Sequence, residues 1–395
     1  MSERILKNIY DELCLTSVFR GVLEKPLFQA FSAYCEAAAK SEKERAYASF
    51  VSEIYENGNG SLTELVQRLV FEDENVFIKS AAQGKRVAKC VENAAKKELA
   101  LFSTFAKITP ADFALDMGTA EEKLPLYDTF NADMVRSFKK RIQEIGKYGY
   151  GIFSSSGMFR LSDDKQIEPI VSADKINMDT FIGYEEERGQ VVENTRAFVQ
   201  GRPAANTLLC GDAGTGKSST VKAVANAFFD EGVRLIELRK DQLRYLPYVM
   251  GKISGNPLKF IIFIDDLAFN RSDDNFSMLK AALEGSASAK ADNAVIYATS
   301  NRRHIIKESF SDRDGDDVHR NDTLQETLSL SERFGLVVLF SKPNKQLYLE
   351  IVRELAEKHG ITLPQTELDL RAEAFALRKG NRSARCAEQF IASLL

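Results

Sequence analysis

The sequence Gly211-Asp-Ala-Gly-Thr-Gly-Lys-Ser218 follows the pattern G-x-x-x-x-G-K-[ST], which forms a phosphate-binding loop where it joins a strand to a helix. The apolar run Asn206–Cys210 before it is typical of a buried strand. Lys217–Phe229 after it has the periodicity of a helix. The pattern therefore stands in the structural context that it needs.

A loop of this kind curls so that its backbone N–H groups point inward, and the following helix adds a positive dipole end. The Lys217 ammonium is expected to reach the β- and γ-phosphates of a nucleoside triphosphate, and the Ser218 hydroxyl is expected to hold Mg²⁺. The full set of predicted loop contacts is Gly211, Asp212, Ala213, Gly214, Thr215, Gly216, Lys217, Ser218 and Ser219.

A second apolar stretch, Phe260–Ile264, ends in two carboxylates and has the form of a Walker B motif. Asp265 is expected to orient the water shell of the Mg²⁺, so that Ser218 and Asp265 form the metal site. Asp266 is the expected general base, which polarises the attacking water. The alternative is that the two acids only cap the next turn.

Composition sets broad limits on the protein. The 395 residues are 44% apolar and 28% charged, with a net charge of −4, as in ordinary globular proteins of two or three domains. Residues 1–150 carry 21 Lys and Arg against 22 Asp and Glu. Nucleic-acid binding is thus possible but unsupported, although a local basic patch can lie within a neutral total.

The cysteines and the apolar runs indicate the compartment. The 5 cysteines are scattered singly, which argues against a zinc site or a disulfide framework. The chain shows no apolar signal core and no run of about 18 apolar residues. We therefore expect a reduced, cytoplasmic protein without a membrane segment.

The pattern along the chain predicts an α/β fold in four parts. Residues 1–145 are expected to form a mostly helical domain for partner recognition, 146–175 a β-hairpin or linker, 176–342 a nucleotide-binding core with a parallel sheet, and 343–395 a helical lid. The predicted N-terminal helices include Glu42–Ile54, Leu62–Phe71, Val76–Phe105 and Met134–Ile145. The predicted core strands are Asn206–Cys210, Val233–Leu238, Lys259–Ile264, Asn293–Thr299 and Gly335–Phe340.

A further buried strand, Ala294–Ser300, closes on Asn301. With the two motifs above, it makes residues 176–395 resemble the AAA+ ATPases, which bind ATP and Mg²⁺ in a P-loop NTPase core. In that fold the strand that carries sensor 1 lies between the Walker A and Walker B strands. The resemblance implies that Asn301 reaches the γ-phosphate region, with Thr299 and Ser300 as alternatives.

Leu328–Gly335 resembles the box VII segment of the DnaA and DnaC branch of AAA+ proteins. The resemblance implies that Arg333 projects into the nucleotide site of a neighbouring subunit, as an arginine finger acting in trans within a homo-oligomer. The alternative is an arginine that pairs with Glu332 or with a helix end.

Lys379–Arg385 resembles sensor 2, which is usually written G-x-x-R, but the third residue after Gly380 is Ser383. Arg382 and Arg385 are therefore both candidates for contacting the phosphates, and we prefer Arg385 because it lies inside the predicted helix.

Phe181–Glu185 resembles the AAA+ segment that packs on adenine, which implies base contacts from Ile182 and Gly183. A plain helix entry is the alternative. Short segments such as Ala298–His304 also resemble those of a bacterial family of AAA+ proteins, which is known only as predicted ATP-binding proteins of unknown function. The Walker B motif ends in Asp-Asp rather than the common Asp-Glu, so slow hydrolysis is expected.

The main hypothesis is an AAA+ ATPase that hydrolyses ATP to drive the assembly or remodelling of an unidentified protein partner. One alternative is a nucleic-acid-associated loader akin to DnaA or DnaC, although no helix-turn-helix or basic recognition helix is evident. The other alternative is a nucleotide-gated scaffold that binds ATP or ADP with little hydrolysis.

Overall fold

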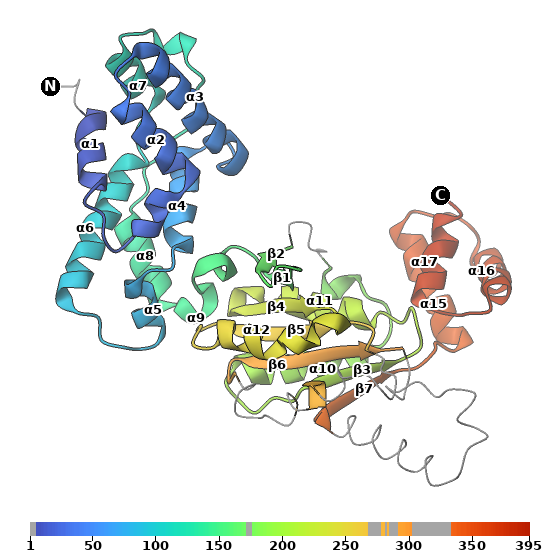
Figure 1. Ribbon diagram of the computed structural model, residues 1–395. Coiled ribbons are helices and arrows are strands. Elements are labelled where there is room, and N and C mark those ends of the chain that lie inside the picture. Colours follow the sequence, from blue (N-terminus) through green and yellow to red (C-terminus); the bar gives the residue numbers. More distant parts are fainter. Residues whose placement is uncertain (1–4, 171–175, 268–277, 281–282, 284–290, 302–332) are drawn as a thin grey trace. The chain divides into compact units, whose positions relative to one another are not determined.

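The computed structural model describes residues 5–170, 176–267, 278–280, 283, 291–301 and 333–395 (Figure 1). The chain divides into two compact units. The first comprises Met1–Ser155 and Gly255–Pro257, and the second comprises Ser156–Ser254 and Leu258–Leu395.

The described part of the first unit is helical, as predicted. Its α-helices are α1 (Ile5–Leu13), α2 (Pro26–Glu36), α3 (Lys40–Asn57), α4 (Leu62–Glu72), α5 (Val76–Ala82), α6 (Lys89–Phe105), α7 (Pro110–Met117), α8 (Met134–Gln143) and α9 (Ile145–Tyr148). The prediction of one continuous helix over 76–105 is wrong. The chain turns between α5 and α6 at Gly84, whose φ of +63° lies outside the helical region.

Aromatic side chains fill the core of this unit. Phe31 packs edge-to-face on Phe105 with ring centroids 4.9 Å apart, and Tyr34 packs likewise on Phe113 at 4.8 Å. The Glu98 carboxylate is 7% exposed and accepts hydrogen bonds from the backbone N–H groups of residues 17–19. These bonds satisfy a buried charge, so its role there is structural.

The second unit is built on a seven-stranded sheet of order β2-β1-β4-β5-β6-β3-β7 (Figure 1). The strands are β1 (Met158–Leu161), β2 (Ile167–Pro169), β3 (Thr207–Gly211), β4 (Val233–Leu238), β5 (Lys259–Ile264), β6 (Ala294–Ser300) and β7 (Leu336–Phe340). All neighbours pair in parallel except β1 and β2. The predicted parallel sheet is confirmed, and each predicted core strand lies within one residue of its observed bounds.

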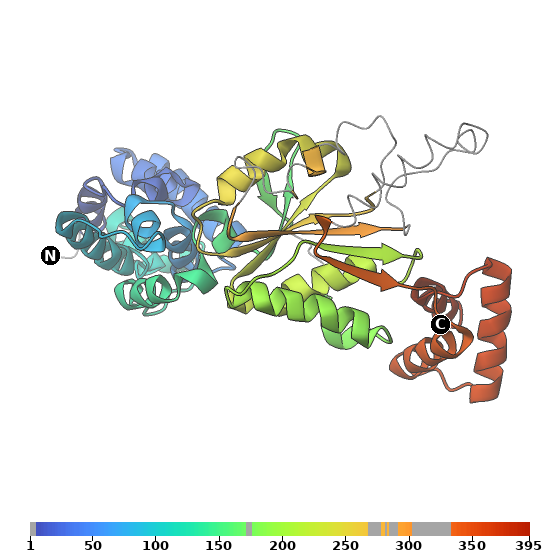
Figure 2. The same cartoon turned by 90° about the horizontal axis from the view of Figure 1, so that it is seen from below.

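Helices cover both faces of this sheet. α10 (Glu185–Val199) and α11 (Lys217–Ala227) lie on one face, and α12 (Leu246–Ile253) lies on the other (Figure 2). Right-handed crossovers explain why α11 and α12 lie on opposite faces, because the connection from β3 to β4 and the one from β4 to β5 run in opposite directions along the sheet.

The strand order places β6 between β3 and β5, which is the order that the AAA+ resemblance implies for the sensor 1, Walker A and Walker B strands. The core therefore has the predicted AAA+ fold. In a parallel sheet the carboxyl ends of the strands share one edge, so the segments that follow β3, β5 and β6 meet there.

The β-hairpin predicted within 146–175 is present as β1 and β2, but it is not separate from the core. β1 pairs in parallel with β4, with Met158 opposite Leu235, and antiparallel with β2, so both strands belong to the core sheet. Residues up to Ser155 belong to the helical unit instead. The parallel pairing joins segments more than seventy positions apart, and local sequence patterns carry no information about it.

Three helices after Pro343 form the predicted lid: α15 (Lys345–Lys358), α16 (Gln365–Lys379) and α17 (Ala384–Ala392). They share an apolar core of their own, which includes Tyr348 and Phe390, and Ile182 packs against it. Ser383 begins the last helix by accepting a hydrogen bond from the N–H of Cys386.

Candidate functional site

The glycines of the loop after β3 allow its close approach to neighbouring segments. Gly211 has a φ of +132°, and a Cβ there would lie 2.0 Å from the carbonyl oxygen of Phe340 in β7. Gly214, at φ +77°, would bring a Cβ within 3.1 Å of Ser383 Oγ and 3.3 Å of Arg385 Cβ at the start of α17. The loop is therefore packed between the sheet and the lid.

Hydrogen bonds fix the shape of the loop. The Asp212 N–H donates to the Phe340 carbonyl at 3.2 Å, and Asp212 Oδ2 accepts from the Lys342 N–H at 3.0 Å. Thr215 Oγ1 donates to the Asp212 carbonyl at 2.9 Å. Ala213 is exposed at the tip, and Gly216 caps α11. A loop pinned in this way is organised before a ligand arrives, which lowers the entropic cost of binding.

Lys217 lies inside the loop and is 5% exposed. Its Nζ donates to the carbonyl oxygens of Gly211 at 3.1 Å and Asp212 at 2.6 Å. Burial lowers the pKa of the ammonium, while the charge of Asp212 partly opposes that effect. An anion in the loop would favour the charged form of Lys217, which is the behaviour required of a phosphate-binding lysine.

The carboxylate of Asp265, which follows β5, accepts hydrogen bonds from the first turn of α11 and from β6. Ser218 Oγ donates to Asp265 Oδ1 at 2.6 Å, and Thr299 Oγ1 donates to the same oxygen at 2.5 Å. The structure thus brings the two predicted metal ligands together. Hydroxyl and carboxylate oxygens suit Mg²⁺, which takes few protein ligands and keeps waters and substrate phosphates.

Asp266 and Asn301, which were predicted as general base and sensor 1, also contact each other. Asn301 Nδ2 donates to Asp266 Oδ1 at 2.8 Å, and the Asp266 N–H donates to Thr299 Oγ1 at 3.0 Å. Asp266 has a φ of +50°. Aspartate tolerates this left-handed conformation better than glutamate does, which gives a physical reason for Asp-Asp at the end of this strand.

A cavity of about 160 Å³ lies beside the loop. The predicted contacts Ile182 and Ser219 line it. Gly183 is not among its lining residues, and its carbonyl accepts a hydrogen bond from Arg188. The lining residues are Thr180, Phe181, Ile182, Arg188, Gly214, Thr215, Gly216, Ser219, Ile351, Leu355, Ala384, Arg385 and Glu388. The cavity therefore joins the phosphate loop, the lid and the segment before α10.

Arg188 is a lining residue that the sequence analysis missed. It is 7% exposed, its Nε has no hydrogen-bond acceptor among the residues that the structure describes, and its guanidinium lies 4.4 Å from the ring centroid of Phe181. Burial lowers its pKa. Its position could have been noticed, because Arg188 shares one helical face with the buried Val191 and Thr195.

The structure distinguishes the two lid arginines. Arg385 lines the cavity, and its backbone N–H donates to the Gly214 carbonyl at 3.4 Å. Arg382 instead makes two hydrogen bonds of 3.0 Å to the Glu373 carboxylate, which raise the pKa of its guanidinium. Arg385 is thus the one that stands beside the loop.

Arg333 is not brought to the loop of its own chain. β7 runs parallel to β3, with Leu336 opposite Thr207 and Phe340 opposite Gly211. Arg333 precedes the amino end of β7, whereas the loop follows the carboxyl end of β3, about 17 Å away along a five-residue strand. Residues 328–332, which carried part of the box VII resemblance, lie outside the described residues.

Three features fit a nucleoside triphosphate with Mg²⁺: the glycines of the loop, the Ser218 hydroxyl beside the Asp265 carboxylate, and the Arg188 Nε, which lacks an acceptor among the described residues.

Comparison with known proteins gives a family model for residues 155–395, whose description is protein of unknown function (DUF815). No curated protein matches the chain. No helix in the described ranges has the length and apolar character to cross a membrane.

Solved structures of the Holliday junction branch migration motor RuvB from Thermotoga maritima are also similar. One is 12% identical, over 55% of this chain and 72% of that chain, with a TM-score of 0.34. A variant of the same motor is 13% identical over the same shares of both chains, with a TM-score of 0.35.

Proposed function

The chain belongs to the family described as protein of unknown function (DUF815), and we propose that it is an AAA+ ATPase that binds and hydrolyses ATP with Mg²⁺. The observation that carries the proposal is the 2.6 Å hydrogen bond between Ser218 of the loop and Asp265 at the end of β5. This bond brings the hydroxyl of the phosphate loop beside the carboxylate that follows β5, and a magnesium-dependent triphosphatase needs both groups at its metal site.

Each residue of the site has a part in this proposal. The loop amides and Lys217 hold the phosphates, and Arg385 approaches them from the lid. Ser218 and Asp265 would hold Mg²⁺, which would supply positive charge to neutralise the phosphates. Asp266 takes the proton of the attacking water, and Asn301 orients that carboxylate through its 2.8 Å hydrogen bond.

The position of Arg333 supports a shared site. Because it stands at the far end of β7 from its own loop, it completes the nucleotide site of a neighbouring subunit in a homo-oligomer. Such head-to-tail contacts between copies generate rings when the rotation closes. ATP turnover would then be coupled to assembly, or to remodelling of a protein client bound by the helical unit.

Replacing Lys217 by Ala tests nucleotide binding directly. We expect the affinity for ATP to fall about 100-fold, since charge-assisted hydrogen bonds to the phosphates are each worth roughly 1.5–3 kcal/mol. Isothermal titration calorimetry with ATP and Mg²⁺ measures the change.

Lys252→Ala is the matched control, because Lys252 is exposed near the end of α12, close to the opposite edge of the sheet. It should bind ATP like the wild type. Equal affinities for the Lys217 variant and the control would remove the basis of the proposed function.

Arg188→Met tests the cavity beside the loop. We propose that the Arg188 Nε donates to the base or ribose of the nucleotide, so ATP affinity should fall about tenfold. Thermal stability should stay the same or rise, because replacing a buried charge by an apolar side chain of similar length is often neutral or stabilising.

Arg196→Met, on the same helix but in an exposed ion pair with Glu193, should leave ATP affinity unchanged. A loss of melting temperature in Arg188→Met without a loss of affinity would instead assign Arg188 a structural role only.

A further inference from the structure

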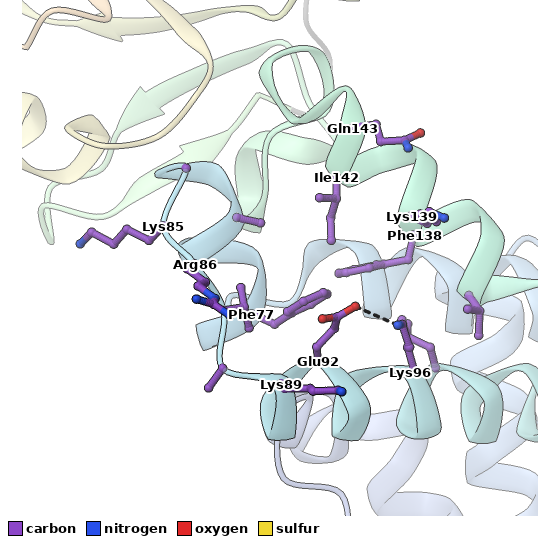
Figure 3. A pocket seen from close by; sticks show the side chains of 16 residues that line it. Phe77, Lys85, Arg86, Lys89, Glu92, Lys96, Phe138, Lys139, Ile142 and Gln143 are labelled. Atoms are coloured by element: carbon purple, nitrogen blue, oxygen red, sulfur yellow. Dashed lines mark hydrogen bonds and ion pairs between the residues drawn. The ribbon is translucent and has the colours of Figure 1, made fainter.

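The helical unit contains a large pocket between α5, α6 and α8 (Figure 3). Its volume is about 1020 Å³, at the upper end of the roughly 300–1,000 Å³ found for small-molecule sites. The lining residues are Phe77, Ala81, Gly84, Lys85, Arg86, Val87, Ala88, Lys89, Glu92, Lys96, Leu99, Val135, Phe138, Lys139, Ile142 and Gln143. We call this set the α5–α8 pocket.

The floor of the α5–α8 pocket is apolar. Phe77 from α5 and Phe138 and Ile142 from α8 point into the space above α6 (Figure 3). Val87, Leu99 and Val135 add to the same surface. Phe77 and Ile142 are only half-buried, so apolar area remains available to a partner.

The rim of the pocket is basic. Lys85, Arg86, Lys89, Lys96 and Lys139 are exposed, and Glu92 is the one acid among the lining residues, paired with Lys96 at 2.8 Å. Five cations against one acid leave the rim strongly basic. Residues 1–150 as a whole are almost neutral, so the charge is concentrated at this pocket.

An apolar floor between cations suits an amphipathic helix, whose apolar side chains enter the pocket while flanking carboxylates meet the rim. Single-stranded nucleic acid fits less well, because it needs free aromatic faces for base stacking. Here the rings of Phe77 and Phe138 stack on each other, at 6.0 Å between centroids and 18° between planes, and Phe138 is 1% exposed.

We propose that the α5–α8 pocket is the docking site for an acidic amphipathic helix of a partner protein. This docking site rests on the proposed function only in one respect: it names the kind of client on which the ATPase would act. Docking itself needs neither ATP nor hydrolysis, because every residue that carries the argument lies in the helical unit.

The test uses the full-length chain and fluorescein-labelled 18-residue peptides, followed by fluorescence anisotropy. One peptide has Leu and Phe on one helical face and Glu on the flanks. The second has the same composition in scrambled order, the third has Lys in place of Glu, and the fourth probe is an oligo-dT of 16 nucleotides. The acidic amphipathic peptide should bind at least about tenfold more tightly than each of the others.

Two variants place that binding at the pocket. Lys89→Glu combined with Lys139→Glu reverses charge at the rim, and Ile142→Asp places a charge on the floor. Both should weaken peptide binding about tenfold or more. The double control, Lys97→Glu with Lys140→Glu, changes exposed neighbours on the same helices that do not line the pocket, and it should bind like the wild type.

Equal binding of the ordered and scrambled peptides, tighter binding of oligo-dT, or equal losses in the rim variant and its control would each overturn the proposal. Lys217→Ala should bind the peptide normally. Failure of the peptide test with normal ATP binding would therefore count against the docking site alone, and the reverse result against the ATPase alone.

Discussion

Arg333→Ala is expected to lower the ATPase rate of the assembled protein about a thousandfold, as the loss of arginine fingers does elsewhere. The reason is geometric. Arg333 lies beyond the amino end of β7 and the phosphate loop lies beyond the carboxyl end of β3, so the guanidinium serves a neighbouring subunit. ATP binding at a single loop should be changed little, because Lys217 and Ser218 are intact.

Mixing two inactive variants tests the trans arrangement. Lys217→Ala has a defective loop but an intact Arg333, and Arg333→Ala has the converse. At equal amounts, about a quarter of the junctions in a closed ring pair an intact loop with an intact finger. Measured steady-state hydrolysis should therefore recover to about that fraction of the wild-type rate.

The control mixture combines Lys217→Ala with Asp266→Asn. Both residues belong to the same subunit's part of the site, so no junction has an intact loop together with an intact base. Its hydrolysis rate should therefore recover less than that of the first mixture. A full wild-type rate for Arg333→Ala alone, independent of protein concentration, would rule out the shared site. No recovery in the first mixture, with assembly intact by light scattering, would place the function of Arg333 within its own chain.

Asp266→Asn is expected to slow hydrolysis by about 10²- to 10⁴-fold while ATP still binds, because it removes the general base. Asparagine is nearly isosteric and tolerates the left-handed backbone at φ +50°, so the variant should fold normally. Single-turnover hydrolysis with excess protein and Mg²⁺ measures the chemical step directly.

Asp292→Asn provides the matched control, since Asp292 is an exposed aspartate just before the amino end of β6. Its rate should equal that of the wild type. Rapid hydrolysis by Asp266→Asn would transfer the role of base to another group. Negligible hydrolysis by the wild-type chain, with tight ATP binding, would favour the nucleotide-gated scaffold over the ATPase.

Local sequence determined much of this protein. The run from Gly211 to Ser218 predicted a loop between a strand and a helix, and the apolar stretch before Asp265 predicted a second strand at the same edge. These features are encoded by neighbouring residues and by periods of two or 3.6, so they can be read without knowledge of distant contacts. The lid helices and the core strands were predicted for the same reason.

Tertiary structure decided what depends on residues far apart in the chain. It paired β1 with β4 and placed the buried Arg188 in the wall of the cavity. It also brought Arg382 into hydrogen-bond contact with Glu373, and Asn301 with Asp266. It also assembled the α5–α8 pocket from helices more than fifty positions apart. Such contacts arise from the packing of whole elements, and a local pattern states which side chains a helix or strand offers but not which partner they meet.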